Sequence, residues 1–169
     1  YVWGMTAEAH SVVTCPELPL YTSSYDVRVL RFSAEENRVT ARMRVSCGGR
    51  SYAWTRSVAL GETGAEFTDH VEATGVMTFQ GRWYLPGRPT ALSEGSAAQG
   101  CSVPGAIYIT EGRVARQSLA HGPLVVESSL PMRLDRTAAM DDENRPTFLA
   151  RLTWTHTGRD FTVRTRFSY

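Results

Sequence analysis

The clearest pattern in the chain is an alternation of apolar and polar residues over 38–60, on both sides of Gly48-Gly49. Successive side chains of a β-strand point to opposite faces, so this alternation predicts two strands with one buried face each. A Gly-Gly pair suits the positive φ angles of a tight hairpin turn. A two-residue turn there places large apolar residues opposite one another in three pairs: Val45 with Tyr52, Met43 with Trp54, and Val39 with Val58.

Similar alternation recurs along the rest of the chain. A second strong hairpin is predicted at 147–169, with a turn over 156–160. Two weaker hairpins are predicted from strands 106–110 and 113–118 around Glu111-Gly112, and from strands 75–80 and 82–85 around Gly81. Further strands are predicted at 25–32, 67–73 and 124–129. One short helix is predicted at 136–143.

About ten short strands separated by frequent turn residues predict an all-β fold. Among such folds we expect an antiparallel β-sandwich or a flattened barrel. The length of 169 residues suits one domain over 1–169. Residues 86–105 are predicted to form a long loop rich in Gly, Ser, Pro and Ala. Because long loops in compact domains are often functional, this loop is the first expected location of a binding site, and 135–146 is the second.

Composition narrows the possible functions. All 18 basic residues are arginine, which excludes lysine Schiff-base chemistry and phosphate-loop lysines. A GC-rich genome explains the absence of lysine, and so would selection against ubiquitin or acetyl transfer. The net charge of +1 does not favour a nucleic-acid partner. No apolar run is long enough to span a membrane. Since the chain begins with Tyr1, it is expected to be a processed product or a segment of a longer chain.

The cysteines bear on the cellular compartment. Cys15, Cys47 and Cys101 form an odd set without a C-x-x-C pair, so the sequence does not support a zinc ribbon or a thioredoxin-type motif. In an oxidising compartment we expect one disulfide, between Cys15 and Cys47. In a reducing one, all three would be small buried thiols. The first alternative predicts a secreted protein or one displayed on a cell or virion surface.

The residue types of common catalytic sites occur without the usual spacing. The sequence contains no G-x-S-x-G motif, and its histidines lack metal-binding spacing. Asp69 and His70 are neighbours in a predicted strand and should therefore point to opposite faces. The acidic run at 141–143 lacks the pattern of a calcium-binding EF-hand loop. We therefore predict no catalytic residue, no metal and no cofactor.

Arginines on the polar faces of the predicted strands are the candidate binding residues. They could bind acidic partners, although charged strand faces also prevent edge-to-edge aggregation. The candidates are Arg38, Arg42 and Arg44 in the first hairpin, Arg88 in the long loop, and Arg164 and Arg166 in the last strand.

Three functions are compatible with these patterns. The favoured one is a non-enzymatic, secreted or surface β-sandwich that binds a protein partner or assembles with copies of itself. The alternative is a β-barrel carrier of a small apolar ligand. The third function is a hydrolase whose site assembles from dispersed residues, which requires a pair among the four histidines to converge with an acidic residue in a cleft. These histidines are His10, His70, His121 and His156.

Overall fold

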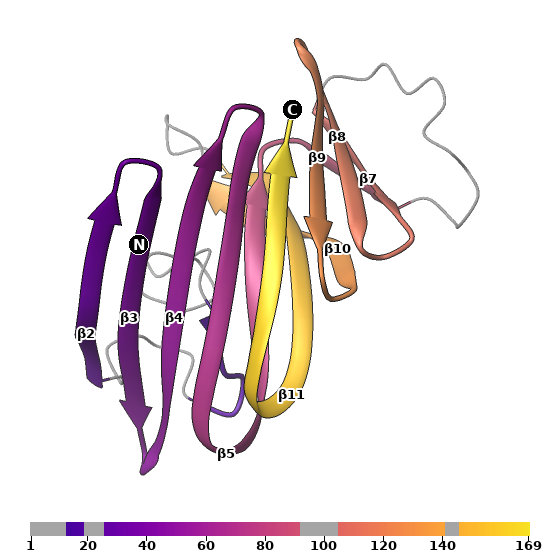
Figure 1. The fold of residues 1–169 in the computed structure, drawn as a ribbon. Coiled ribbons are helices and arrows are strands. Elements are labelled where there is room, and N and C mark those ends of the chain that lie inside the picture. Colours follow the sequence, from indigo (N-terminus) through magenta and orange to yellow (C-terminus); the bar gives the residue numbers. More distant parts are fainter. Residues whose placement is uncertain (1–12, 19–25, 92–104, 141–145) are drawn as a thin grey trace.

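The structure is a computed structural model that describes residues 13–18, 26–91, 105–140 and 146–169. The described residues form strands and no helix (Figure 1). The strands are β1 (Val13–Thr14), β2 (Asp26–Glu35), β3 (Arg38–Cys47), β4 (Arg50–Gly61), β5 (Gly64–Leu85), β6 (Arg88–Ala91), β7 (Ala106–Thr110), β8 (Val114–Leu119), β9 (Gly122–Ser128), β10 (Met132–Met140) and β11 (Pro146–Ser168).

All strands belong to one open sheet with the order β2-β3-β4-β5-β11-β9-β8-β7-β6. In addition, β1 pairs with β5 and β10 pairs with β11. Each pairing is antiparallel except that of β6 with β7. The prediction of an all-β fold is therefore confirmed. None of the described residues forms a helix of the length and hydropathy needed to span a membrane.

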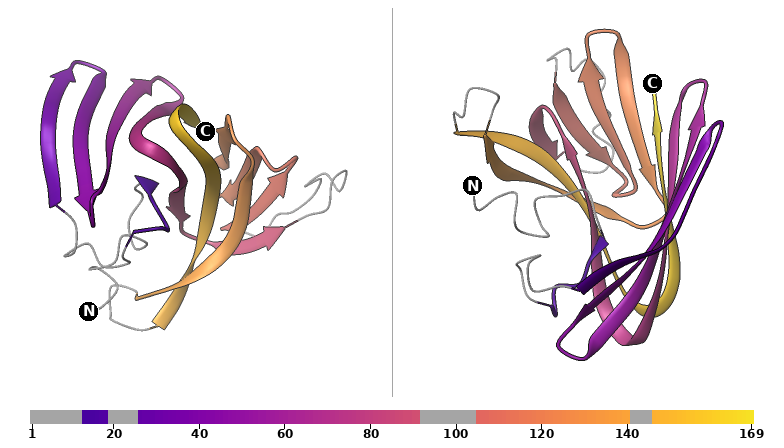
Figure 2. Two further views of the ribbon diagram at one scale, coloured as in Figure 1. Left: turned by 90° about the horizontal axis from the view of Figure 1, so that it is seen from below. Right: turned by 90° about the vertical axis from the view of Figure 1, so that its left-hand side faces the viewer.

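Two long strands, β5 and β11, organise the sheet. They pair along almost their whole length, from Gly64 opposite Ser168 to Leu85 opposite Ala150. Both strands bend near their middles, and a register shift between Gly158 and Asp160 marks the bend in β11. The sheet consequently folds over on itself (Figure 2). The first half of β5 lies beside β4, and its second half lies in a second layer with β1, the first half of β11, and β10.

Aromatic side chains fill the space between the two layers. Tyr52 of β4 meets Phe79 of the second layer with ring centroids 5.2 Å apart. Trp83 of the second layer packs between Phe67 and Phe167, at 4.7 and 5.1 Å. Edge-on aromatic pairs of this kind add to the stabilisation from burial. The core therefore joins the two layers as well as neighbouring strands.

Two predicted hairpins are confirmed by the strand register. In β3 and β4, the three predicted apolar pairs lie opposite one another, and Gly48 and Gly49 have φ angles of 58° and 79°. In β7 and β8, Thr110 pairs with Val114 across the turn. Both hairpins consist of strands adjacent in sequence, so local alternation and turn residues were sufficient to predict them.

The other two predicted hairpins are wrong, because β5 and β11 are continuous through the predicted turns. A β-carbon at position 81 would overlap the indole ring of Trp154, so the glycine there accommodates a close contact rather than a turn. Residues 156–160 contain the bulge of β11. Each strand is paired with a partner far away in the sequence, and that pairing overrides the local turn signals.

Two further predictions need correction. The predicted helix at 136–143 is wrong over 136–140, since these residues belong to β10 and pair with β11. Its remaining residues lie outside the described part. The predicted loop at 86–105 contains strand β6, which pairs in parallel with β7. Residues 92–104 of that segment also lie outside the described part, so the structure does not test whether they bind a ligand.

A buried ion pair lies on the core face of the first layer. Asp69 of β5 is only 1% exposed and accepts hydrogen bonds from Arg56 Nε at 2.7 Å and Arg56 Nη2 at 3.0 Å. The indole Nε1 of Trp54 donates to the same carboxylate at 2.7 Å. The guanidinium lies over the rings of Trp54 and Trp83, 4.8 Å from each centroid. Hydrogen bonds and aromatic faces together compensate one buried charge, that of Asp69, and one partly buried charge, that of Arg56.

We expect Gly81→Ala to destabilise the fold by about 1–3 kcal/mol, because the added methyl group must displace Trp154 or the backbone. Gly75→Ala is the matched control, since it lies in the same strand and a β-carbon there meets no atom within 4 Å. Urea denaturation of both variants measures the difference. Equal stability of the two variants would contradict the role given to position 81.

Asp69→Ala should destabilise the protein by about 3–5 kcal/mol, because it leaves the buried guanidinium of Arg56 without its carboxylate. The double variant Arg56→Met, Asp69→Leu removes both charges and should be more stable than the single variant. Urea denaturation distinguishes the two. If the single variant lost less than about 1 kcal/mol, the ion pair would not have the structural importance inferred here.

Candidate interaction surface

In the described part of the chain, β2 is an edge strand whose two faces and outer edge are exposed. Among the described residues it pairs only with β3, so its outer edge has no strand partner. Nine of its ten residues are exposed, and Ser33 is half-buried. Figure 2 shows β2 and β3 at one end of the curved sheet, away from the second layer. An edge of this kind can pair with a further strand.

One face of β2 continues the core face of the sheet. Val27 lies opposite Val45 and Val29 lies opposite Met43, and both partners belong to the core. On β2, however, Val29 and Phe32 are 67% and 65% exposed. We call the exposed residues of this face the apolar surface, and they are Val27, Val29, Phe32, Val39 and Leu60. Beside Leu60, a pocket of about 280 Å³ is lined by the β4–β5 turn and Arg166.

A bulge at Leu30 determines which side chains share a face of β2. The register passes from Val29 opposite Met43 to Arg31 opposite Arg42, so one extra residue is accommodated. As a result Arg28 and Arg31 lie on the same face, although they are three positions apart in the sequence. Strict alternation would place them on opposite faces.

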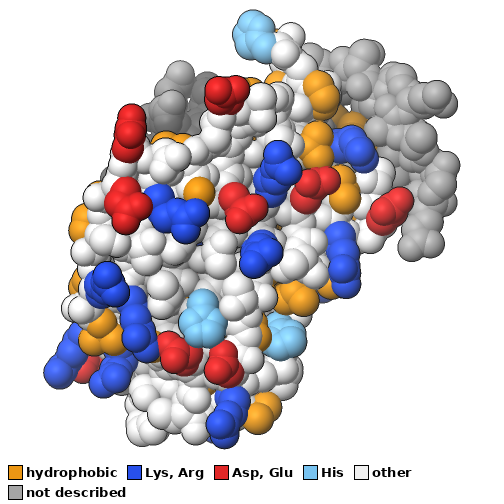
Figure 3. All heavy atoms as spheres, in the orientation of Figure 1, with side chains coloured by type: hydrophobic (Ala, Val, Ile, Leu, Met, Phe, Trp, Pro, Cys, Tyr) orange, Lys and Arg blue, Asp and Glu red, His pale blue; other side chains and the backbone are white. Residues whose placement is uncertain are grey.

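The face of β2 and β3 opposite the apolar surface carries four arginines. Arg28 lies opposite Arg44, and Arg31 lies opposite Arg42. We call these four residues the arginine cluster; Figure 3 shows basic side chains gathered over this end of the sheet. Arg28 forms an exposed ion pair with Asp26 at 3.1 Å, and Arg42 reaches Glu72 at 2.6 Å. Within the described part of the chain, Arg31 and Arg44 have no acidic partner.

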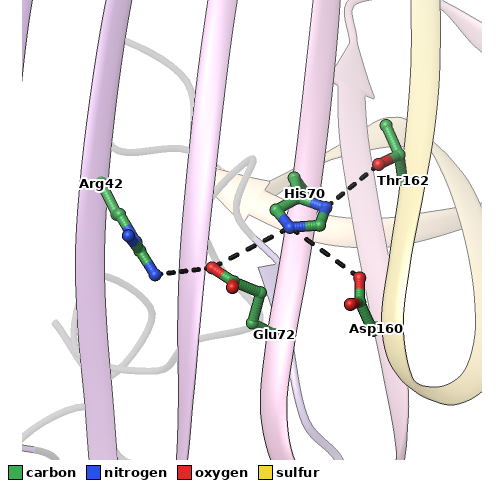
Figure 4. Close-up of polar contacts among 5 residues, drawn as sticks. All are labelled: Arg42, His70, Glu72, Asp160 and Thr162. Carbon is green, nitrogen blue, oxygen red and sulfur yellow. Dashed lines mark hydrogen bonds and ion pairs between the residues drawn. The ribbon is translucent and has the colours of Figure 1, made fainter.

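A polar network connects the arginine cluster to β5 and β11 (Figure 4). Glu72 accepts from Arg42 and lies 3.9 Å from His70 Nε2. The same ring nitrogen is 3.8 Å from Asp160, and His70 Nδ1 is 3.1 Å from the hydroxyl of Thr162. Asp69 points to the opposite face, as predicted for neighbours in a strand. The network therefore lies on the solvent face and is separate from the buried ion pair.

The network contains the residue types of a hydrolytic triad without the matching geometry. Its histidine-to-carboxylate distances, 3.8 and 3.9 Å, exceed hydrogen-bonding distance. The side chains of His70 and Asp160 are 37% and 69% exposed. Preorganised catalysis needs donors aimed into a site that excludes water, whereas this face of the sheet is open. The geometry around His70 therefore does not match a hydrolytic triad, and His10 lies outside the described residues.

The predicted arginine candidates separate into three groups. Arg42 and Arg44 belong to the arginine cluster, and Arg38 lies on the same face near the β2–β3 turn, opposite Glu35. Arg164 and Arg166 are exposed on β11, two strands beyond β4. Arg88 begins β6 at the far end of the strand order. Sequence reasoning missed Arg28 and Arg31, because their shared face depends on the bulge.

Cys15 and Cys47 are both free thiols in the structure, so the predicted disulfide is not formed. Cys101 lies outside the described residues. Cys15 is buried, and this burial raises the pKa of its thiol above the usual value. Cys47 is half-buried at the end of β3. Among the described residues, no group of three or more His, Cys, Asp or Glu has an arrangement that could hold a metal ion.

Comparisons with known proteins show the fold alone. No protein-family model matches the sequence, and no curated protein is significantly similar to it. The structure is similar to part of a heparinase III, with a TM-score of 0.67 and 12% identity over 99% of this chain. The heparan sulfate lyase HepC from Pedobacter heparinus gives a TM-score of 0.63 and 10% identity, also over 99% of this chain. The chain spans 25% of the length of each of these two proteins.

A 4-alpha-glucanotransferase from Thermococcus litoralis shares the fold less closely. Its TM-score is 0.55 with 13% identity, over 86% of this chain and 22% of its own. In all three proteins, a fold like this one makes up about a quarter of a larger chain.

Thiol counting tests the state of the cysteines. In the Cys101→Ser variant, we expect the denatured protein to contain two reactive thiols, those of Cys15 and Cys47. In the native protein Cys47 should react first, because burial shields Cys15 and its raised pKa leaves less thiolate near neutral pH. Raising the pH should therefore accelerate labelling of Cys15. Absence of both thiols in the unreduced denatured protein would instead indicate the disulfide.

Proposed function

We propose that this chain is a non-enzymatic binding module that takes up a segment of a partner protein at the β2 end of its sheet. The observation that carries the proposal is the exposure of β2, whose apolar face continues the core while its outer edge has no strand partner in the described structure. Backbone groups of an edge strand provide affinity for an added strand, and neighbouring side chains provide specificity. Secretion or surface display stays a prediction from the cysteine pattern.

A segment of a partner fits this site better than a second copy of the chain. Two copies joined at β2 in one continuous sheet would bring two arginine clusters together on one face. Like charges on adjacent strands are destabilising. The fold comparisons are compatible with a module role, since similar folds occur as about a quarter of larger proteins. The carrier alternative receives less support, because bulky side chains such as Phe79 and Trp154 fill the space between the layers.

The test is a selection of random ten-residue peptides, the length of β2, displayed on phage against the wild-type protein. Enriched peptides should bind the double variant Val29→Thr, Phe32→Thr at least about tenfold more weakly, because two apolar side chains are lost from the contact. Threonine retains the preference for a strand. Val76→Thr, an exposed position at the bend of β5, is the matched control and should leave binding unchanged.

Two results would overturn the proposal. One is a failure to enrich any peptide, and the other is equal binding of the enriched peptides by the wild-type protein and the double variant. Sedimentation of the wild-type protein gives an independent check, for which we expect a monomer. A stable dimer that the double variant abolishes would show that a second copy occupies β2.

A further inference from the structure

We infer that the partner segment is a strand in which apolar residues alternate with acidic residues. This inference rests on the proposed function and specifies the chemistry of the partner. It follows from the two faces of β2, since an added strand would place its successive side chains above and below the sheet in turn.

The apolar half of the pattern follows from the core-side face. Side chains on neighbouring strands lie about 4.5–5.5 Å apart when directly opposite, so every second residue of an added strand would contact Val27, Val29 or Phe32. Those contacts would bury the sides of these three side chains that point toward the outer edge of β2. Apolar partner residues are therefore favoured at these positions.

The acidic half follows from the arginine cluster. The remaining residues of the added strand would lie beside Arg28 and Arg31, with Arg42 and Arg44 one strand further in. The four guanidinium groups have two acidic partners among the described residues, Asp26 and Glu72. The Nε atom of Arg42 is shielded from solvent and has no hydrogen-bond partner among the described residues. Carboxylates beside Arg28 and Arg31 would relieve the repulsion among these arginines and accept charge-assisted hydrogen bonds, whereas Asp26 and Glu35 near the two ends of the same face favour uncharged neighbours.

The same features select against other partners. A strand carrying lysine or arginine at these positions would meet like charges on the adjacent strand, which is destabilising. The bulge at Leu30 interrupts the regular edge and opposes indiscriminate pairing. Repulsion of wrong partners and attraction of the right one therefore arise from one set of residues.

The experiment uses two synthetic ten-residue peptides, the length of β2, that alternate valine with either glutamate or lysine. Isothermal titration should show the glutamate peptide binding the wild-type protein at least about tenfold more tightly than the lysine peptide. The preference should reverse in the variant Arg28→Glu, Arg31→Glu. The control Arg164→Glu changes a charge on β11, on the same face of the sheet as the arginine cluster. This variant should still prefer the glutamate peptide.

Backbone methylation distinguishes strand addition from simple charge attraction. In an added strand, every second amide would donate to β2 and the amides between them would point away. Methylating the set of amides that points toward β2 should therefore abolish binding of the glutamate peptide. Methylating the other set should preserve it. An equal loss of affinity with both sets, or no loss with either set, would exclude strand addition.

The outcomes separate this inference from the proposed function. If phage peptides bind through the apolar surface but show no alternation of acidic residues, and charge reversal has no effect, the proposed function stands and the inference is wrong. If neither kind of peptide depends on Val29 and Phe32, the proposed function itself fails.

Discussion

The buried carboxylate of Asp69 places a strict condition on how the layers of the fold come together. A buried charge is tolerated only when it is paired and hydrogen-bonded, and two separate parts of the chain, β4 and the second half of β5, contribute to that compensation. The register of β4 against β5 places Arg56 and Trp54 within reach of the carboxylate. The return of β5 in the second layer brings Trp83 over the guanidinium. The ion pair itself joins two neighbouring strands, and its aromatic cover also requires the sheet to fold over.

Within the described part of the chain, the exposure of the apolar surface is a consequence of how far that second layer extends. The returning halves of β5 and β11, with β1 and β10, cover the core face at β4 and β5, where Tyr52, Trp54 and Val71 are buried. Cover decreases at β3, where Val45 is buried and Val39 is exposed, and none of the ten residues of β2 is buried. The same apolar pattern that builds the core thus continues beyond it. An incompletely covered face results from the geometry of the layers and does not require a separate structural element.

Sequence patterns predicted pairs of strands that are adjacent in the chain, and failed where the contacting residues are far apart in sequence. The pairing of Val45 with Tyr52 followed from two adjacent strands and one turn, so alternation alone gave the register. Gly81 looked like a turn because glycine usually ends a strand, but here it accommodates the indole of Trp154, a residue that no local pattern connects with it. The candidate site was half predicted, for a related reason. Arg42 and Arg44 alternate regularly, whereas Arg28 and Arg31 share their face only through a bulge that pairing with β3 defines.

The bulge also explains how an exposed edge strand could pair with a partner and still avoid aggregation. Without it, Arg31 would share a face with Val29, and neither face of β2 would be uniformly apolar or basic. With it, one face is apolar and the middle of the other is basic, so the basic face would repel a strand that carries lysine or arginine beside Arg28 and Arg31. A uniformly apolar edge would pair with many chains, including copies of itself, and a uniformly charged edge would gain little from burial. Separation of the two properties onto opposite faces would make the proposed strand addition conditional on the partner's own alternation, so a bulged edge strand gains specificity from the order of its side chains.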